Sequence, residues 1–503
     1  MPQLDERKED FIIKPPDYKE AVKTAKEIYI QFYYLSPEVE SSLVKILHRF
    51  LERYDLLYMK DVLYTVLKEL INNAIKANIK RIYFQAQGLT IDDKDAYRTG
   101  MEKFKEDTYG NDSKYDFSDL KKEKMLVRVS FIAHSDKMIF HVINNVPILD
   151  EEIAKIEARV KKAYKYNDIS EAFDDVLDDS EGAGLGLIMA LMLFKNIGLP
   201  AETFHVSRKN NLTVAAIRIP QMIDRAEIHT KITDEIMKEI ENIPSFPTSI
   251  KEIQRILSNP ESTIKEISDN IKRDPALTAN IMKIANSAGY ITIKRVDTIE
   301  EAVKKIGTKG INTLLVASGV QDILEIRYKK YEKLWKNSYK TAFYAQRLAV
   351  KLDKAQLVEY VYLSALLTDI GRIVLLSLKP DLAKRIKDIV GSKGSDELGI
   401  FEEIGIGMSH STLGSVILKK WNFNEAVTSV VELHHRPHLA PEKYRELIYI
   451  VYLASAMLDI EERKGRYEMM DEDVLELFNL TVHEDFNSLH NDIKTAYEEH
   501  AAE

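Results

Sequence analysis

The spacing of the apolar residues changes near residue 220, and this change constrains the fold more than any other feature of the sequence. Before it, segments with helical spacing are mixed with short segments in which apolar and polar residues alternate, as they do in strands. After it, almost every segment has the spacing of a helix. The sequence therefore predicts an α+β fold class, with a mixed α/β domain first, an all-α domain second and a boundary near Gln221.

The composition is that of an ordinary globular protein without disulfide bonds. The chain has 503 residues, of which 45% are hydrophobic, and it has no Cys. At this length two or three domains can each bury a core of their own. The net charge of -9 disfavours a dedicated nucleic-acid-binding protein, because such a protein needs a positive surface to meet the phosphates.

No segment predicts export or a membrane span. The charged N-terminus lacks the apolar run of a signal peptide, and the apolar stretch at residues 185–194 is much shorter than the ~20 residues that cross a bilayer. We therefore expect a cytoplasmic protein without membrane contact. Residues 1–20 are polar, contain Pro15 and Pro16, and are expected to form a flexible arm.

Residues 21–222 are expected to form the first domain. Residues 21–78 have helical spacing, and Ser36, Pro37 and Glu38 are typical of an N-cap, a first-turn proline and a first-turn acid. Alternation predicts strands at residues 80–84, 126–129, 138–142 and 211–220. A polar segment near residues 88–122 is expected to be an insertion.

Glu69 and Asn73 lie four residues apart and therefore on one face of a predicted helix. The amide oxygen of Asn73 is a suitable ligand for Mg²⁺, and a carboxylate such as Glu69 can orient or deprotonate a water molecule. By itself, such a pair is most often part of a solvated helix face.

Gly182, Gly184 and Gly186 come directly before an apolar helix expected at residues 188–194. Glycines at a helix N-terminus let backbone N–H groups approach phosphate oxygens, and the helix dipole adds to the attraction. Taken alone, a glycine-rich turn is most often only a turn.

In this order, with strands between them, these motifs resemble the nucleotide-binding domain of the GHKL superfamily, which includes gyrase, heat-shock ATPases, mismatch-repair ATPases and histidine kinases. The resemblance covers roughly residues 55–220. It implies a GHKL-like α/β sandwich in which Asn73 holds Mg²⁺ and Glu69 activates water in the hydrolysing members. It also implies that Gly182, Gly184 and Gly186 close over the phosphates of ATP.

The segment that would bind the adenine base departs from the family pattern. The family has Asp-x-Gly-x-Gly after a strand, whereas this sequence has Asn144 in place of the Asp and Val146 and Ile148 in place of the glycines. A neutral amide makes a weaker hydrogen bond than a carboxylate. Weakened, altered and absent ATP binding therefore all remain open. The acidic segment at residues 173–181 would also repel a triphosphate unless a metal neutralised it.

His48 is the one upstream candidate for the phosphoacceptor of a histidine kinase. It lies in an expected helix, and we interpret it as an ordinary helix residue. Autokinase activity is therefore not expected.

The second half is expected to contain a connecting helix at residues 223–242, an all-α domain at residues 243–440 and a helical C-terminal extension at residues 441–503. Asp274 and Pro275 predict the start of one helix. Thr298 and Glu301 predict the capping box of the next helix, which is expected to end at Gly307.

Several short motifs follow one another along this half. They are Pro244-x-Phe246-Pro247, Asp274-Pro275-Ala276-Leu277, Asn286-Ser287-Ala288, Ala302-x-x-x-Ile306-Gly307, Leu366-Leu367-Thr368-Asp369-Ile370-Gly371, His410, Gly414, Trp421 and His434-His435. The series resembles the HDOD domain, a relative of HD-type phosphohydrolases found in bacterial signalling proteins. It covers about residues 240–440.

HD phosphohydrolases hold metal ions with a His-Asp pair and further His residues, and a metal-bound water attacks a phosphate. Here the pair reads Thr368-Asp369, so the His is missing. Asp369, His410, His434 and His435 could form a partial site, because imidazole and carboxylate are ligands for Fe, Mn or Zn. The resemblance implies a domain that has lost catalysis, and a bound transition metal is not expected.

These observations predict a bacterial signalling protein with two modules. The HDOD module would contact other signalling proteins, and the GHKL-like module would sense a nucleotide, with ATP and Mg²⁺ as the implied cofactors. Two alternatives remain open. One is an active Mg-dependent ATPase or anti-sigma-type protein kinase that uses Glu69 and Asn73. The other is a metal-dependent phosphodiesterase that uses Asp369, His410 and His434.

Overall fold

The structure is a computed structural model. It describes residues 27–54, 56–89, 100, 104, 118–134, 137–166, 185–196, 198–220, 231–285, 296–327, 332–378, 408–462 and 465–502. Contacts divide the chain into two compact units, Met1–Thr230 and Lys231–Glu503. Most of the insertion expected at residues 88–122 and all of the arm at residues 1–20 lie outside the described residues.

The first unit is built on a five-stranded antiparallel sheet with the strand order β1-β2-β3-β5-β4. Its strands are β1 (Glu27–Phe32), β2 (Val127–Ala133), β3 (Lys137–Asn144), β4 (Phe204–Lys209) and β5 (Leu212–Pro220). In β3 the buried residues Met138, Phe140 and Val142 alternate with half-buried ones, because successive side chains of a strand point to opposite faces. The expected strands at residues 126–129, 138–142 and 211–220 are therefore confirmed.

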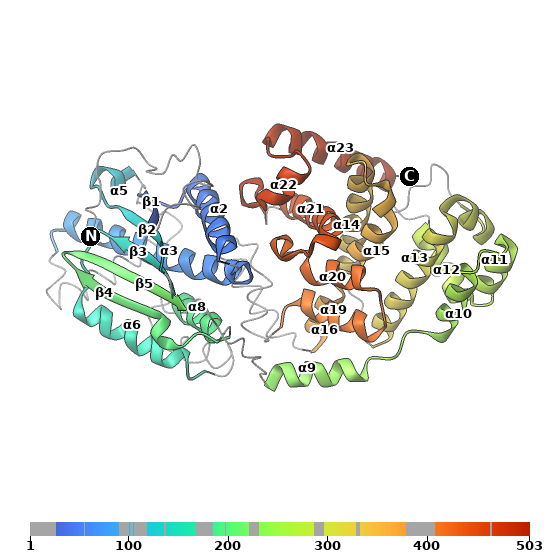
Figure 1. The fold of residues 1–503 in the computed structure, drawn as a ribbon, viewed down its shortest axis with the longest axis horizontal. Helices are drawn as coiled ribbons and strands as arrows, with labels where there is room; N and C mark the ends of the chain where they lie inside the picture. Colours follow the sequence, from blue (N-terminus) through green and yellow to red (C-terminus); the bar gives the residue numbers. More distant parts are fainter. Residues whose placement is uncertain are drawn as a thin grey trace. The chain divides into compact units, whose positions relative to one another are not determined.

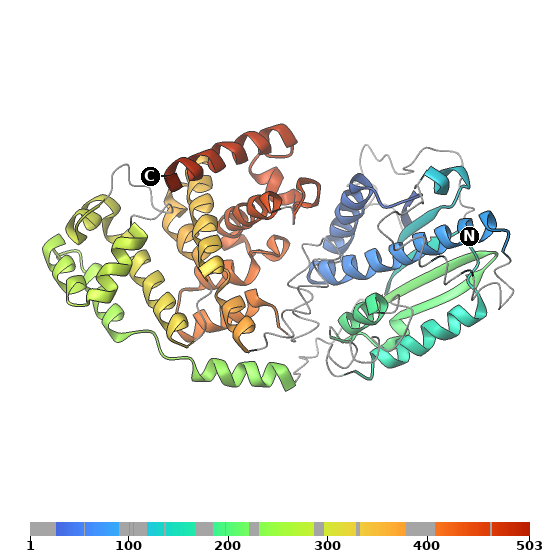
Figure 2. The ribbon, with the colours of Figure 1, turned by 180° about the vertical axis from the view of Figure 1, so that it is seen from behind.

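The helices of this unit are α2 (Pro37–Arg53), α3 (Lys60–Ala86), α5 (Ser118–Lys122), α6 (Asp150–Ala163) and α8 (Leu185–Asn196). The long helix α3 packs on β2 and β3, behind the sheet in Figure 1 and in front of it in Figure 2. Helix α8 contacts both α3 and α6. The described part of the molecule is thus mostly helical, with one small antiparallel sheet.

Helix α2 begins where the sequence predicts it. The side chain of Ser36 accepts a hydrogen bond from the backbone nitrogen of Val39, at 3.3 Å, and Pro37 occupies the first turn. Farther along the helix, the ring of Phe50 lies 5.7 Å from that of Phe131 and 5.8 Å from that of Phe140. This aromatic cluster fixes α2 against the centre of the sheet.

The strand expected at residues 80–84 is wrong, because α3 continues through this segment to Ala86. Ile75, Ile79 and Ile82 recur at helical spacing, and Tyr83 and Phe84 are buried within a small cluster. Packing therefore overrides the strand propensity of isoleucine and the aromatic residues. The helix ends at Ala86, and the positive φ of 64° at Gly88 allows the turn that follows it.

The sequence analysis also misassigned the segment that forms β1. Residues 21–78 were expected to be helical, but Glu27–Phe32 is an edge strand paired with β2. Ile28, Ile30 and Phe32 are buried at every second position, which is strand spacing. Strand β4 was not predicted either; it pairs with β5 at the other edge of the sheet.

In the second unit every regular element that the structure describes is a helix. The α-helices are α9 (Lys231–Asn242), α10 (Thr248–Leu257), α11 (Ile264–Lys272), α12 (Pro275–Ala285), α13 (Ile299–Arg327), α14 (Glu332–Lys351), α15 (Val358–Leu366), α16 (Ile370–Leu378), α19 (His410–Lys420), α20 (Glu425–Leu433), α21 (Arg445–Glu461), α22 (Glu472–Leu477) and α23 (His483–Ala502). Helices α14, α15, α20 and α21 lie side by side in the centre of the unit (Figure 1).

The predicted caps of this unit are present. Asp274 accepts a hydrogen bond from the backbone nitrogen of Leu277 (3.0 Å), and Thr298 accepts one from that of Glu301 (3.1 Å). Gly307 has a φ of 79° and interrupts the helical conformation inside α13, where the sequence predicts an end. A second helix follows at once, so the two are continuous across a kink.

Helix α9 overlaps the expected connecting helix, and its C-terminal end is bound by Lys420 of α19 in the same unit. The Nζ atom of Lys420 lies 2.6, 2.7 and 2.8 Å from the carbonyl oxygens of Ile240, Glu241 and Ile243. A cation at the C-terminal end of a helix satisfies carbonyl groups that have no partner within the helix. The indole nitrogen of Trp421 donates to the carbonyl oxygen of Pro244 at 2.9 Å, which fixes the following turn.

The C-terminal helices are joined to α14 through Glu461. Its carboxylate accepts hydrogen bonds from Tyr344 (2.7 Å), Lys340 (2.5 Å) and His490 (2.9 Å). Although burial opposes ionisation, these three donors lower the pKa of Glu461 to about 2. The extension at residues 441–503 therefore packs as part of the second unit.

One apolar stretch in this unit, Ala355–Ser377, is long and apolar enough to cross a membrane by composition alone. It is longer than residues 185–194, which the sequence analysis took as the most apolar stretch. In the structure it forms the separate helices α15 and α16, and 67% of its most apolar window is buried. Such burial is typical of core helices, so the stretch is weak support for a membrane span.

Candidate functional site

The first unit contains a cavity of about 270 Å³ between α3, α6 and the sheet. Apolar residues line much of it, among them Val142, Val206, Ala215, Ala77 and Ile156. A concave site with an apolar floor and a few polar groups is the usual form of a small-molecule site.

Asn73 and Asn144 line this same cavity, although they come from α3 and β3. Asn144 is 2% exposed, and its amide nitrogen donates to the amide oxygen of Asn78 at 3.0 Å. The amide nitrogen of Asn78 donates in turn to the carbonyl oxygen of Leu126 at 3.4 Å. This chain of amides orients the Asn144 side chain, whose oxygen is an acceptor for a ligand.

Val146 and Ile148 line the cavity and are 6% and 7% exposed. The segment that carries them is held by Thr213, whose hydroxyl donates to the carbonyl oxygen of Val146 at 2.6 Å. Two branched side chains therefore fill space at the positions where the GHKL resemblance expects glycines.

The other residues of the predicted phosphate site are placed differently. Glu69 is half-buried on α3 and is not among the residues that line the cavity. Gly182, Gly184 and the acidic segment at residues 173–181 lie outside the described residues. Gly186 lies within α8, which begins at Leu185 and thus earlier than the helix expected at residues 188–194.

Basic residues dominate the charged part of the cavity lining. Five cations line it, Lys76, Lys80, Arg81, Lys155 and Arg159, and the acid among its described lining residues is Glu152. The sequence analysis missed this set because it assigned Lys80 and Arg81 to a strand. Lys155 and Arg159 are four residues apart and therefore on one helix face, and this spacing was a signal for two of the five cations.

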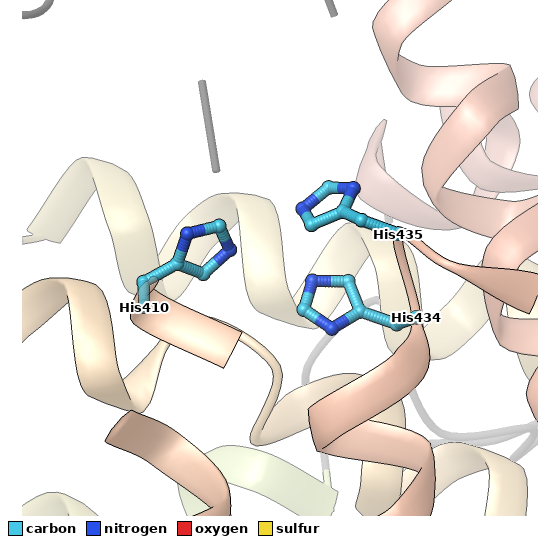
Figure 3. A group of neighbouring side chains, drawn as sticks. All are labelled: His410, His434 and His435. Carbon is cyan, nitrogen blue, oxygen red and sulfur yellow. The ribbon is translucent and has the colours of Figure 1, made fainter. Parts of the chain in front are cut away.

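The second candidate site is a cluster of three histidines in the second unit. His410 is the first residue of α19, and His434 and His435 directly follow α20 (Figure 3). One nitrogen of each ring lies within 4.8 Å of the others. The ring centroids of His434 and His435 are 4.0 Å apart, and that of His410 lies 5.1 Å from His435. The fold thus brings together histidines that are far apart in the sequence.

Two glycines bring the helices of this cluster into close contact. A Cβ atom on Gly371 of α16 would lie 2.0 Å from the carbonyl oxygen of His410 and 2.6 Å from the backbone nitrogen of Gly414. Only a residue without a side chain fits at such a distance. Gly371 therefore lets α16 approach α19, which places Asp369 and Arg372 near His410.

Arg372 is the main feature of the cluster that the sequence analysis missed. Its Nη1 atom lies 2.8 Å from Oδ1 of Asp369, and its Nη2 atom lies 3.2 Å from Nε2 of His410. Thr368, at the position of the missing His, donates its hydroxyl to the carbonyl oxygen of Ala365 at 2.9 Å. The guanidinium of Arg372 thus binds Asp369, and the hydroxyl of Thr368 is hydrogen-bonded within its own turn.

Two histidines of the cluster, His434 and His435, have lowered pKa values. Burial, followed by the neighbouring His410, lowers the pKa of His434 to about 3. Its Nδ1–H donates to the carbonyl oxygen of Val431 at 2.8 Å, which leaves the lone pair on Nε2. Partial desolvation and the rings of His434 and His410 also lower the pKa of His435. The side chain of His435 is exposed, so its lowered pKa owes more to the nearby rings and to the guanidinium groups of Arg372 and Arg436 than to burial.

The donor set does not fit a hydrolytic metal centre. Neutral imidazoles are good ligands for a transition metal, but such a centre also needs both the His and the carboxylate of the HD pair. Here Asp369 is bound by Arg372, and the guanidinium adds a positive charge beside His410 that opposes a cation.

The family model described as the HDOD domain matches residues 243–437. The chain contains an HDOD domain. A protein from Treponema pallidum (strain Nichols), described as uncharacterized, is 28% identical over 488 residues, which cover 97% of this chain and 95% of that protein. The likeness to the Treponema protein therefore spans both units.

Two solved structures resemble this chain in part. An HDOD domain protein from Geobacter sulfurreducens has a TM-score of 0.45 and 21% identity, over 54% of this chain and 95% of that chain. A protein from Marinobacter aquaeolei VT8, provisionally named a signal transduction protein, has a TM-score of 0.44 and 16% identity, over 60% of this chain and 75% of that chain. At these scores the domain assignment rests on the family match alone.

Proposed function

We propose that this protein is a cytoplasmic bacterial regulatory protein in which the HDOD domain binds other signalling proteins and does not hydrolyse a substrate. The N-terminal unit would act as the sensor that controls this contact. Two modules in one chain support such a division of roles, because one has a ligand-sized cavity and the described histidine cluster of the other lacks the HD pair.

The contact between Arg372 and Asp369 carries the first half of this proposal. A guanidinium 2.8 Å from the carboxylate supplies internally the positive charge that a metal would supply in a phosphohydrolase. Thr is also a poor metal ligand at the position of the missing His. The cluster is therefore a structural junction between α16, α19 and the end of α20.

Metal analysis of the wild type and of a variant designed to bind metal tests whether the cluster lacks a catalytic metal. The wild-type protein should retain less than one equivalent of Fe, Mn or Zn after purification and should turn over ATP and cyclic di-GMP far more slowly than the ~1 per second of ordinary enzymes. The double substitution Thr368→His with Arg372→Ala should raise bound metal toward one equivalent, because it restores a ligand and removes the competing cation. Wild-type hydrolysis at an ordinary enzyme rate would refute the proposal.

For the N-terminal unit, we infer a degenerate GHKL-like module that binds a nucleotide, with Asn73 as the Mg²⁺ ligand. Its support is the position of Asn73 and Asn144 on one cavity of the first unit. Glu69, which an active ATPase or kinase would need, is not among the lining residues, so sensing is favoured over turnover.

Calorimetry with ATP, ADP and GTP, with and without Mg²⁺, tests the nucleotide proposal. Binding should depend on Mg²⁺, and Asn73→Ala should abolish that dependence. Glu69→Gln is the matched control on the same helix face and should leave the affinity unchanged. Equal binding of all three nucleotides by Asn73→Ala and by the wild type would contradict the assignment.

A further inference from the structure

The cavity of the first unit has a strongly uneven charge distribution. Lys80 and Arg81 reach it from α3, whereas Lys155 and Arg159 reach it from α6. Lys76 adds a fifth cation, and Glu152 is the acid in the described lining. Five of the charged lining residues are basic and one is acidic, and a cavity lined mainly by one sign of charge attracts ions of the opposite sign.

The contacts of the charged lining residues show that they join α3 to α6. Lys80 of α3 forms an ion pair with Glu152 of α6, so the one acid bridges the cavity. A second oxygen of Glu152 accepts a hydrogen bond from the backbone nitrogen of Leu149 at 3.1 Å and caps α6. The guanidinium of Arg81 donates to the carbonyl oxygen of Pro147 at 3.2 Å, which holds it near the N-terminus of α6.

The distance between Asn73 and Lys80 along α3 sets the length of a ligand that would contact both residues. Asn73 and Lys80 are seven residues apart, which is two helical turns and about 10 Å along the axis. A di- or triphosphate chain that begins at the Mg²⁺ on Asn73 spans much of such a distance. The base would lie on the apolar floor beside Asn144, and the terminal phosphate would lie between α3 and α6.

We propose that Lys80, Arg81, Lys155 and Arg159 form a phosphate subsite between α3 and α6. The ligand class is a phosphorylated ligand with an apolar or aromatic body, and the proposal rests on the nucleotide-binding function inferred for this unit. The bound phosphate competes with Glu152 for Lys80, so Glu152 limits the affinity. Charge at the α3–α6 junction, in addition to the Mg²⁺ ligand Asn73, then determines the strength of binding.

Charge substitutions of opposite sign test this proposal, with ATP and pyrophosphate as probes and adenosine as the uncharged comparison. The double substitution Lys155→Gln with Arg159→Gln should weaken ATP binding about tenfold or more in low salt. Glu152→Gln should strengthen it about threefold, since glutamine keeps an acceptor for the α6 cap but removes the competing charge. Calorimetry measures each affinity.

The matched control lies on the same helix. Lys161 and Lys162 are exposed on α6 and are not among the residues that line the cavity, so Lys161→Gln with Lys162→Gln removes two charges without touching the subsite. This variant should bind ATP as the wild type does. Raising the salt concentration should weaken binding to the wild type more than binding to the Lys155/Arg159 variant.

The outcomes separate this proposal from the nucleotide function. If ATP binding is lost in Asn73→Ala but unchanged in the Lys155/Arg159 variant, the unit binds nucleotide and the phosphate subsite is wrong. A loss of affinity in Glu152→Gln equal to that of the cation variant would show that these residues act only on packing, which also overturns it. If neither ATP nor pyrophosphate binds at 1 mM in low salt, both proposals fail.

Discussion

The cavity of the first unit and the histidine cluster of the second unit both gather positive charge, but they hold it differently. Five basic residues line the open volume of the cavity, opposite one acid. In the cluster, the guanidinium of Arg372 is bound to Asp369 and lies beside His410. The difference teaches that cations around an open volume leave room for an anion, whereas a cation paired within a helix junction is taken up by packing.

The largest expected effect is at the close contact that builds the cluster. Gly371→Ala should lower the stability of the second unit by about 3 kcal/mol or more, because the added Cβ meets backbone atoms that cannot move aside. Both tryptophans, Trp335 and Trp421, lie in this unit, so their fluorescence during urea unfolding reports on it alone. Gly307→Ala is the control: its Cβ has open space, and only the positive φ should cost about 1 kcal/mol. Equal effects of the two substitutions would remove the close-packing argument.

The next effect concerns the paired cation. Asp369→Asn should destabilise the second unit by roughly 2 kcal/mol, because Arg372 loses its charged partner in a mostly buried position. Asp492→Asn breaks the exposed pair with Lys351 and should cost less than about 0.5 kcal/mol. Tryptophan-monitored unfolding measures both variants. A stabilised Asp369→Asn protein would show that the pair is not a packing element.

The pH dependence tests whether the folded cluster keeps His434 neutral. The folded pKa of His434 is about 3, below its ordinary value of 6.5, so the unfolded chain binds a proton that the folded chain excludes. The contribution of His434 to stability is therefore complete above pH 6.5 and falls by about 1.4 kcal/mol per pH unit below it, down to about pH 3. Unfolding at about pH 7.5 and about pH 5.5 should show this slope, and His434→Asn should flatten it.

The control for this slope is His483→Asn, because His483 is exposed on α23 of the same unit. Its substitution should leave the pH dependence as it is in the wild type. A slope that survives in His434→Asn would assign the acid sensitivity to another group.

The smallest effect lies in the frame of the cavity, which depends on neutral hydrogen bonds. Thr213→Val removes the bond to the carbonyl oxygen of Val146 and should cost the first unit about 1 kcal/mol. Hydrogen exchange in peptides of β3 and β5 measures it, since this unit has no tryptophan. Thr65→Val on α3 is the control, because its hydroxyl bonds only within its own helix, to the carbonyl oxygen of Asp61. If the two variants exchange alike, the bond does not hold the Val146 segment.

Local signals in the sequence predicted helix starts and central strands well. Ser36, Asp274 and Thr298 each accept the expected capping bond, because a cap involves atoms only three residues apart. The same local reasoning failed at residues 80–84, where burial of Tyr83 and Phe84 on a long helix outweighs their strand propensity.

The candidate sites were predicted less completely than the fold. The sequence named the cluster residues Asp369, His410 and His434, because their order matches a known domain. It did not name Arg372, whose role depends on an approach of two helices that only Gly371 makes possible. It also missed the cations of α3 and α6, which meet across a cavity rather than along the chain.

By itself, the sequence determined the two-part organisation, the HDOD domain and the Thr at position 368, where the HD resemblance expects a His, because periodicity, motif order and residue identity are written along the chain. Only the tertiary structure decided that Asp369 is bound by an internal guanidinium and that basic residues from α3 and α6 surround one cavity. The physical reason is that electrostatic interactions depend on distance in space, and folding brings together charges that the sequence keeps apart.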